Sequence, residues 1–154
     1  MGTEIERKFL VRESELPDLA EGQDLQQGYL DSAELTVRVR VAHDRAWLTL
    51  KGPTEGASRL EFEFPIPRDE AMEMLAVWRQ SGVVSKTRYR VRHGSHLWEI
   101  DRFHDENQGL VMAEVELESE SEPVEIPPWV EREVTGDHRY FNAYLAAHPF
   151  VSWV

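Results

Sequence analysis

Apolar and polar residues alternate along most of this chain. Successive side chains of a β-strand point to opposite faces, so a period of two residues predicts strands with one apolar and one polar face. Turn-forming residues separate most of the alternating segments, which lie at 3–11, 25–32, 35–43, 46–52, 59–66, 84–92, 96–103 and 110–118. So many strands with short connections predict an antiparallel meander that closes into an eight-stranded β-barrel.

Two segments follow helical spacing instead. Asp69 is predicted to cap a helix that ends at Gly82, and Asp137 is predicted to cap a second helix that closes at Pro149. Residues 119–129 have no regular pattern and are predicted to be a linker. We therefore expect an α+β fold that is mainly β, with a few helices flanking the barrel.

Composition narrows the class of protein. A length of 154 residues fits a single domain spanning 1–154. The chain has no cysteine, which excludes disulfides and thiolate metal sites. The net charge of -12 argues against a nucleic-acid partner. No stretch approaches the roughly 20 apolar residues of a membrane span, and the N-terminus lacks a signal-peptide core. These features predict a cytoplasmic protein without a membrane partner.

The polar faces of the predicted strands sort their charges by sign. The basic positions are Lys8, Arg38, Arg40, Lys51, Lys86 and Arg88. The acidic positions are Glu4, Glu6, Glu61, Glu63, Asp101, Glu114 and Glu116. For any one strand, a solvated face is the simpler interpretation. Solvation alone does not explain the sorting across the whole set, because like charges directly opposite one another destabilise a sheet.

Two ligands explain the sorting better. Carboxylates without histidine or cysteine neighbours suit Mg²⁺ or Mn²⁺. Rows of Arg and Lys suit a chain of phosphates, because Arg binds phosphate through two hydrogen bonds and Lys acts as a point charge. An eight-stranded barrel has room for one small ligand. The sequence therefore predicts an acidic half and a basic half that clamp a metal–polyphosphate complex.

The charged rows carry a family resemblance. The segment Glu4-Ile5-Glu6-Arg7-Lys8 has the E-x-E-x-K form that is the signature of the triphosphate tunnel metalloenzymes, also called CYTH proteins. The chain resembles that family over almost its whole length, in order, through Gln27-Gly28-Tyr29-Leu30, Arg38-Val39-Arg40, Leu48-Thr49-Leu50-Lys51, Arg59-Leu60-Glu61-Phe62-Glu63, Lys86-Thr87-Arg88-Tyr89, Glu114-Val115-Glu116 and Asp137-His138-Arg139-Tyr140-Phe141-Asn142.

The resemblance implies a tunnel that binds a linear triphosphate with one or two Mg²⁺ or Mn²⁺ ions. Short bacterial members are generally inorganic triphosphatases, which release pyrophosphate and phosphate. By this resemblance the acidic positions face metal or its bound water, and the basic positions hold phosphates. Lys8 with Tyr29 is expected to place or activate the attacking water. His138 departs from the family, where Lys is common. Arg90 extends the Lys86–Arg88 row and is expected either at the tunnel mouth or in solvent, and Glu99 and Glu118 are expected to be peripheral.

Other functions stay open at this point. A relative acting on thiamine triphosphate or a nucleoside triphosphate, or an adenylyl cyclase, needs a pocket for the organic group; Trp47, Trp98 and Trp129 are candidate platforms, with core packing as the simpler role. A non-catalytic polyphosphate- or nucleotide-binding module would need only the basic rows. Two helices are few for covering eight strands, so a homodimer is a further open alternative.

Overall fold

The computed structural model describes residues 2–31, 34–78 and 82–153, apart from the side chain of Asp31. The strands are β1 (Thr3–Val11), β2 (Gln23–Asp31), β3 (Thr36–Val41), β4 (Ala46–Lys51), β5 (Ser58–Ile66), β6 (Val83–His93), β7 (His96–Phe103), β8 (Val111–Glu116) and β9 (Val130–Glu133). The α-helices are α1 (Arg68–Trp78) and α2 (Asn142–Ala147).

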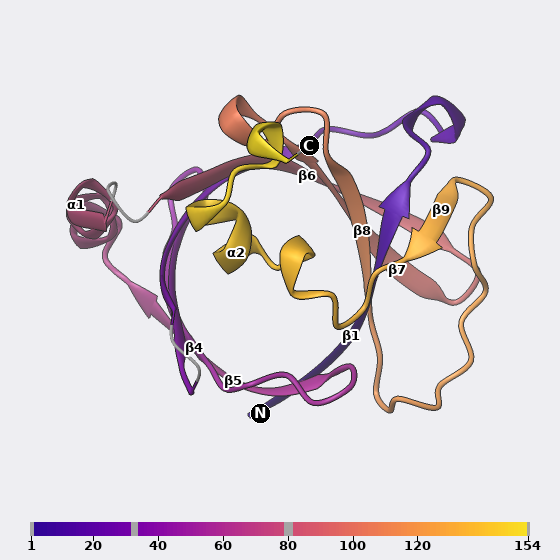
Figure 1. Cartoon of the computed structure of the whole chain (residues 1–154), viewed down its shortest axis with the longest axis horizontal. Coiled ribbons are helices and arrows are strands. Elements are labelled where there is room, and N and C mark those ends of the chain that lie inside the picture. The colour runs from indigo at the N-terminus through magenta and orange to yellow at the C-terminus, as the bar shows by residue number, and fades with distance from the viewer. Residues whose placement is uncertain (1, 32–33, 79–81, 154) are drawn as a thin grey trace.

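Eight strands form a closed antiparallel barrel. Around the ring they follow the order β1, β8, β7, β6, β2, β3, β4 and β5. Pairing of Thr3, Glu4 and Ile5 on β1 with β5 closes the ring, which is seen end-on in Figure 1. The barrel predicted from the sequence is thus confirmed. β9 lies outside the ring and pairs with the later half of β1, and it was not predicted because four residues carry too little pattern.

Apolar clusters lie on the outside of the barrel wall and also inside one mouth of the barrel, where Met112 and Leu145 belong to one buried cluster beneath α2. One cluster lies between β1, β7, β8 and the segments at 12–22 and 119–130, and includes Phe9, Trp98 and Trp129. A second lies between α1 and β3, around Val39 and Leu75. Figure 1 shows α1 and the segment leading to β9 on opposite outer sides of the ring. The outward residues of the alternating pattern therefore make most of the core along the wall, which leaves the inward residues away from the α2 mouth free to be charged.

The predicted second helix is divided in two. Asp137 does act as a cap, but its side chain accepts from the Arg139 N–H at the start of a 3₁₀ turn, His138–Tyr140. Phe141 then adopts an extended backbone, and α2 begins at Asn142. Together these pieces lie across one mouth of the barrel (Figure 1). The interruption turns Phe141 and Asn142 toward the interior.

The predicted first helix begins one residue early. α1 starts at Arg68, so Asp69 lies within its first turn and is not its cap. The predicted end of this helix, at Gly82, comes directly after residues 79–81, which lie outside the described part of the chain. The predicted strand end at Ser32 lies outside the described part as well. Gly82 itself has a φ of 94°, and a Cβ there would lie 1.7 Å from the Ala146 carbonyl oxygen. Only glycine fits where β6 begins beneath α2. No helix among the described residues is long and apolar enough to cross a membrane.

Candidate active site

The barrel encloses a cavity of about 750 Å³ whose wall is charged. All eight barrel strands contribute to it. Its basic residues are Lys8, Arg38, Arg40, Lys51, Arg59, Lys86, Arg88 and Arg90, and its acidic residues are Glu4, Glu6, Glu61, Glu63, Glu99, Glu114 and Glu116. The structure thus brings together all the basic residues predicted from the sequence and all the predicted acidic ones except Asp101.

Barrel closure sorts these charges into two facing halves. β5, β1, β8 and β7 are consecutive around the ring and carry all the glutamates of the cavity. β6, β2, β3 and β4 complete the ring and carry most of the cations. Lys8 and Arg59 are the cations that lie within the acidic half. The cavity therefore has one face suited to a polyanion and another suited to a cation.

Asp101 contacts the basic half from the inner face of β7 without lining the cavity itself. It is buried, and its carboxylate accepts from Arg88 Nε at 2.8 Å, Arg88 Nη2 at 2.9 Å and Lys86 Nζ at 2.7 Å. Burial acts to raise its pKa, but the neighbouring Arg88 and Lys86 outweigh burial and lower the pKa to about 2. Both carboxylate oxygens are occupied by these contacts. In this structure Asp101 therefore positions Lys86 and Arg88, and its role as a metal ligand stays a prediction.

Arg38 holds an unused hydrogen-bond donor. Its Nη2 donates to Thr49 Oγ1 and Glu63 Oε2, each at 3.1 Å. Its Nε is buried and has no hydrogen-bond partner among the described residues. An unpaired buried donor is costly, so this atom is available to an oxygen of a ligand.

Arg40 shows how closely the cations are packed. Burial, followed by the like charges of Arg38 and Arg88, lowers its pKa to about 10. Cations held this close to one another are stabilised when a multivalent anion binds between them. The basic half is therefore built for a polyanion.

The acidic half contains carboxylates in hydrogen-bonded pairs. Glu6 pairs with Glu114, and Glu4 pairs with Glu61. Two carboxyl groups hydrogen-bond to each other only when one carries a proton. Burial and then the charge of Glu114 raise the pKa of Glu6, and burial and then the hydrogen bond to Glu4 raise the pKa of Glu61 to about 7. The raised pKa values of Glu6 and Glu61 therefore favour a shared proton in each pair.

The partner carboxylates stay ionised despite their burial. Burial acts to raise the pKa of Glu4, but Lys51 and the Glu61 hydrogen bond outweigh it, so the pKa is lowered. For Glu114, Lys8 and the Glu6 hydrogen bond outweigh burial in the same way. A divalent cation could take the place of the shared protons in both pairs.

These carboxylates fit a hard metal ion. No cluster of three or more acidic or histidine side chains in the described ranges has the geometry of a complete metal site. Mg²⁺, however, usually keeps several waters and takes one or two carboxylates together with substrate phosphates. The cavity wall supplies carboxylates and, within the described residues, neither histidine nor cysteine. The donor chemistry matches that pattern.

The C-terminal segment contacts the lysines of the cavity. Lys8 Nζ donates to the Tyr140 carbonyl oxygen at 3.1 Å and lies 5.3 Å from the centre of the Phe141 ring. Lys86 Nζ donates to Asn142 Oδ1 at 2.9 Å. The interrupted helix therefore supplies acceptors to both ammonium groups at one mouth of the tunnel.

Lys8 and Tyr29 line the same cavity but have separate partners. The Tyr29 hydroxyl accepts from Gln27 Nε2 at 2.7 Å, whereas Lys8 is bound to Tyr140. Their joint role with the attacking water stays a prediction.

Some cavity residues were missed or undervalued from the sequence. Arg59 lies two residues before Glu61, so the two-residue period alone places it on the same inward face. Glu99 was expected to be peripheral, yet it lines the cavity and pairs at 3.2 Å with Arg90, for which the tunnel mouth and solvent were both open. Gln27 and Asn142 carried no charge signal and become visible only through their contacts.

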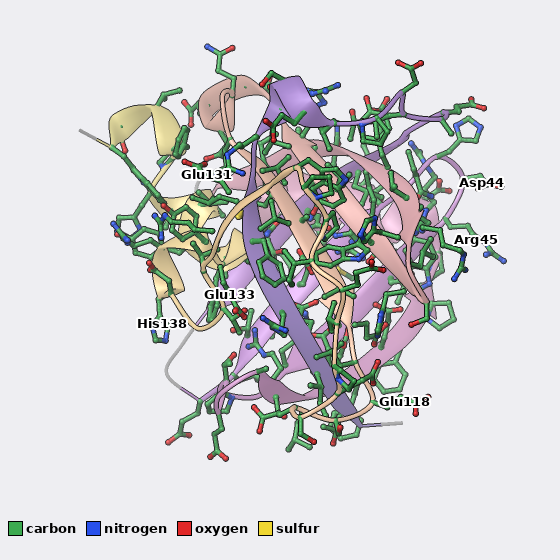
Figure 2. The ribbon with its side chains drawn as sticks, turned by 90° about the vertical axis from the view of Figure 1, so that its right-hand side faces the viewer. Asp44, Arg45, Glu118, Glu131, Glu133 and His138 are labelled. Carbon is green, nitrogen blue, oxygen red and sulfur yellow. The ribbon has the colours of Figure 1, made fainter. Side chains whose placement is uncertain are left out.

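Other residues lie away from the cavity. His138 and Glu118 are exposed and do not line it, and Figure 2 shows them near the outer ends of the molecule. Trp98 and Trp129 belong to the outer core, and Trp47 does not line the cavity either. None of the three tryptophans therefore forms a platform inside the tunnel.

Comparison with known proteins identifies the family. Residues 2–143 match the CYTH domain. The chain belongs to the CYTH family. This CYTH chain is 44% identical over 151 residues to an inorganic triphosphatase of Acetivibrio thermocellus, with 97% of each chain covered. It is 40% identical over 152 residues to an inorganic triphosphatase of Nitrosomonas europaea, covering 94% of this chain and 97% of that one.

A solved CYTH-like barrel supports the same conclusion. The crystal structure of the inorganic triphosphatase NE1496 matches with a TM-score of 0.67 at 35% identity, over 93% of this chain and 97% of that chain. The resemblance inferred from the ordered charged motifs is confirmed, together with the barrel.

Proposed function

We propose that this CYTH protein hydrolyses inorganic triphosphate to pyrophosphate and phosphate inside its barrel, with Mg²⁺ or Mn²⁺ as cofactor. The observation that carries the proposal is a single cavity in which a cationic half faces proton-sharing glutamate pairs. The two relatives at 44% and 40% identity are inorganic triphosphatases, which supports the choice of substrate.

The basic half binds and orients the substrate. Arg38 offers its unpaired Nε, and Arg88 is already fixed by Asp101, so neither guanidinium must be ordered at the moment of binding. Each charge-assisted hydrogen bond contributes roughly 1.5–3 kcal/mol. Six such residues (Lys8, Arg38, Arg40, Lys51, Lys86 and Arg88) suffice for tight binding after the repulsion between them is subtracted.

The acidic half holds the metal in this proposal. Each glutamate pair, Glu4 with Glu61 and Glu6 with Glu114, would provide the carboxylate ligands of one metal ion, and Glu63 and Glu116 would hold its waters. A bound divalent ion neutralises phosphate charge and lowers the pKa of a bound water. Pairing of carboxylates before the ion arrives keeps their mutual repulsion small.

Hydrolysis itself demands positioning more than covalent chemistry. Water adds to the terminal phosphorus, the bridging P–O bond breaks, and the bridging oxygen leaves with pyrophosphate. A carboxylate of the acidic half accepts the proton of the water. Lys8 and Tyr29, which line the cavity at the closed mouth, would hold the water or the terminal phosphate in line.

A substrate panel tests the proposal. Purified protein is assayed with tripolyphosphate, ATP and thiamine triphosphate in Mg²⁺ or Mn²⁺, with phosphate, pyrophosphate and cyclic AMP measured as products. We expect tripolyphosphate to give the highest kcat/KM, with equal amounts of phosphate and pyrophosphate. A higher kcat/KM for ATP or thiamine triphosphate would show that the organic triphosphate is the substrate instead. Formation of cyclic AMP would indicate a cyclase, and tight binding without product would indicate a binding module.

A further inference from the structure

Gln27 is a fully buried amide at the junction of the basic half and the C-terminal segment. Its Oε1 accepts from Arg40 Nε. Its Nε2 donates to the Tyr29 hydroxyl at 2.7 Å and to Asn142 Oδ1 at 3.3 Å. A guanidinium only donates, so Arg40 decides which end of the amide faces it. The NH₂ end must therefore face Tyr29.

This orientation decides where the Tyr29 proton points. A hydroxyl that accepts from Gln27 has its own proton free to donate in another direction. Burial raises the pKa of Tyr29, so the phenol stays protonated at neutral pH. Its neighbour across the ladder on β3 is Arg38, which offers no acceptor. Tyr29 lines the cavity, so the free proton is available to a ligand there.

We propose that Gln27 is a positioning residue that turns the Tyr29 hydroxyl proton into the cavity, where it donates to an oxygen of the bound triphosphate. The inference rests on the proposed function and adds a neutral donor to the cationic row. A preorganised donor of this kind stabilises an oxygen that gains negative charge during the reaction. If Gln27 had only a structural role, its replacement would alter packing, and the effect on kcat would be the same with or without the Tyr29 hydroxyl.

A double-mutant cycle separates these roles. In Gln27→Glu both side-chain oxygens are acceptors, so Arg40 keeps its partner while the Tyr29 proton turns onto the new carboxylate. Tyr29→Phe removes the proton altogether. We expect each change to lower kcat for tripolyphosphate by roughly ten- to a hundredfold, the value of one hydrogen bond to a charged group. When Gln27→Glu is added to Tyr29→Phe, we expect kcat to fall by less than about a further twofold, because both changes remove the same interaction.

The matched control is Gln26→Glu. Gln26 is the preceding residue of β2 and is exposed, so the same chemical change is made on the outer face. We expect its kcat to stay within about twofold of wild type, as is usual for an exposed site. Losses that multiply in the double variant, or an equal loss in Gln26→Glu, would overturn the role of Gln27.

Failure of the proposed function gives a different result. Wild-type turnover is measured first, and its absence would overturn the triphosphatase proposal alone. The dissociation constant of tripolyphosphate is then measured by calorimetry for the same set of variants. We expect each single change to weaken binding, because a donor is lost. The loss of affinity in the double variant should be smaller than the product of the two single losses. If Gln27→Glu does not fold, Gln27→Met removes the amide at similar volume, and multiplying losses with Tyr29→Phe would again reject the inference.

Discussion

Asp101 holds Arg88 through both of its carboxylate oxygens, at 2.8 Å from Nε and 2.9 Å from Nη2. The two residues are directly opposite each other on β7 and β6, and both side chains are buried. The pair fixes one guanidinium of the phosphate row before any substrate arrives. A carboxylate that the sequence groups with the metal ligands thus contacts the basic half in this structure.

Asp101→Asn tests this support. The change keeps the shape of the side chain but removes the charge that balances Lys86 and Arg88. We expect the free energy of unfolding to fall by about 3–5 kcal/mol, the usual cost of breaking a buried ion pair from one side. Urea denaturation measures it, with the exposed Glu118→Gln as control. A loss no greater than that of the control would show that Asp101 does not support the pair.

Arg38→Ala tests the phosphate row. We expect KM for tripolyphosphate to rise roughly ten- to a hundredfold, because one charge-assisted contact is lost. Arg45→Ala is the matched control: Arg45 is exposed in the β3–β4 turn and projects away from the barrel in Figure 2. Steady-state kinetics of both variants gives the answer. An unchanged KM in Arg38→Ala would remove that residue from the row.

The fold was largely predictable because each barrel strand carries a two-residue pattern. Arg38 and Arg40 alternate with Val37, Val39 and Val41, and Val39 and Val41 indeed pack on the outer face with Ala71 and Leu75 of α1. The break at Phe141 was not predictable, since nothing in its local sequence forbids a helix. It follows from the contacts of the C-terminal segment with the tunnel mouth.

The membership of the site was also predictable, but its pairing was not. Inward charges follow from alternation, whereas partners depend on the order of strands around the ring. Closure of β5 onto β1 brings Glu61 to Glu4, which are 57 residues apart in the numbering of the chain. No local pattern shows that Lys86 and Arg88 bury Asp101 away from the cavity, because it follows the same alternation as residues that line it.

Glu61→Gln tests the shared proton of its pair. Because the pKa of Glu61 is raised from 4.5 to about 7, the stability it contributes is fully present below about pH 4.5 and is lost as the pH rises through about 7. The amide keeps a donor for Glu4 and cannot ionise. We therefore expect the free energy of unfolding of Glu61→Gln to exceed that of wild type by ~1–2 kcal/mol at pH 8, a value that allows for the partial exposure of Glu61. The difference should be smaller at pH 5.

The same variant is expected to lose metal-dependent turnover. Urea denaturation at the two pH values and phosphate release from tripolyphosphate measure the two effects. Glu73→Gln, exposed on α1, should change neither. Full turnover in Glu61→Gln, or no gain of stability at pH 8, would contradict the assignment of Glu61.

Metal binding is expected to release protons. The Glu6–Glu114 and Glu4–Glu61 pairs each share a proton that a divalent ion must displace. Affinity for Mg²⁺ or Mn²⁺ should therefore rise with pH across about pH 6 to 8. Calorimetry in two buffers of different ionisation enthalpy counts the protons released. Binding without proton release, at constant affinity over this range, would show that these pairs are not the ligands.

The central claim is that one tunnel holds the metal and the triphosphate on opposite faces. Its most direct test is a crystal structure with Mn²⁺ and a non-hydrolysable imido analogue of tripolyphosphate, with the metal located by anomalous scattering. We expect a manganese peak beside the Glu4–Glu61 pair or the Glu6–Glu114 pair, and phosphates in contact with Arg38 and Arg88. Manganese away from these carboxylates, or an analogue bound outside the barrel, would contradict it.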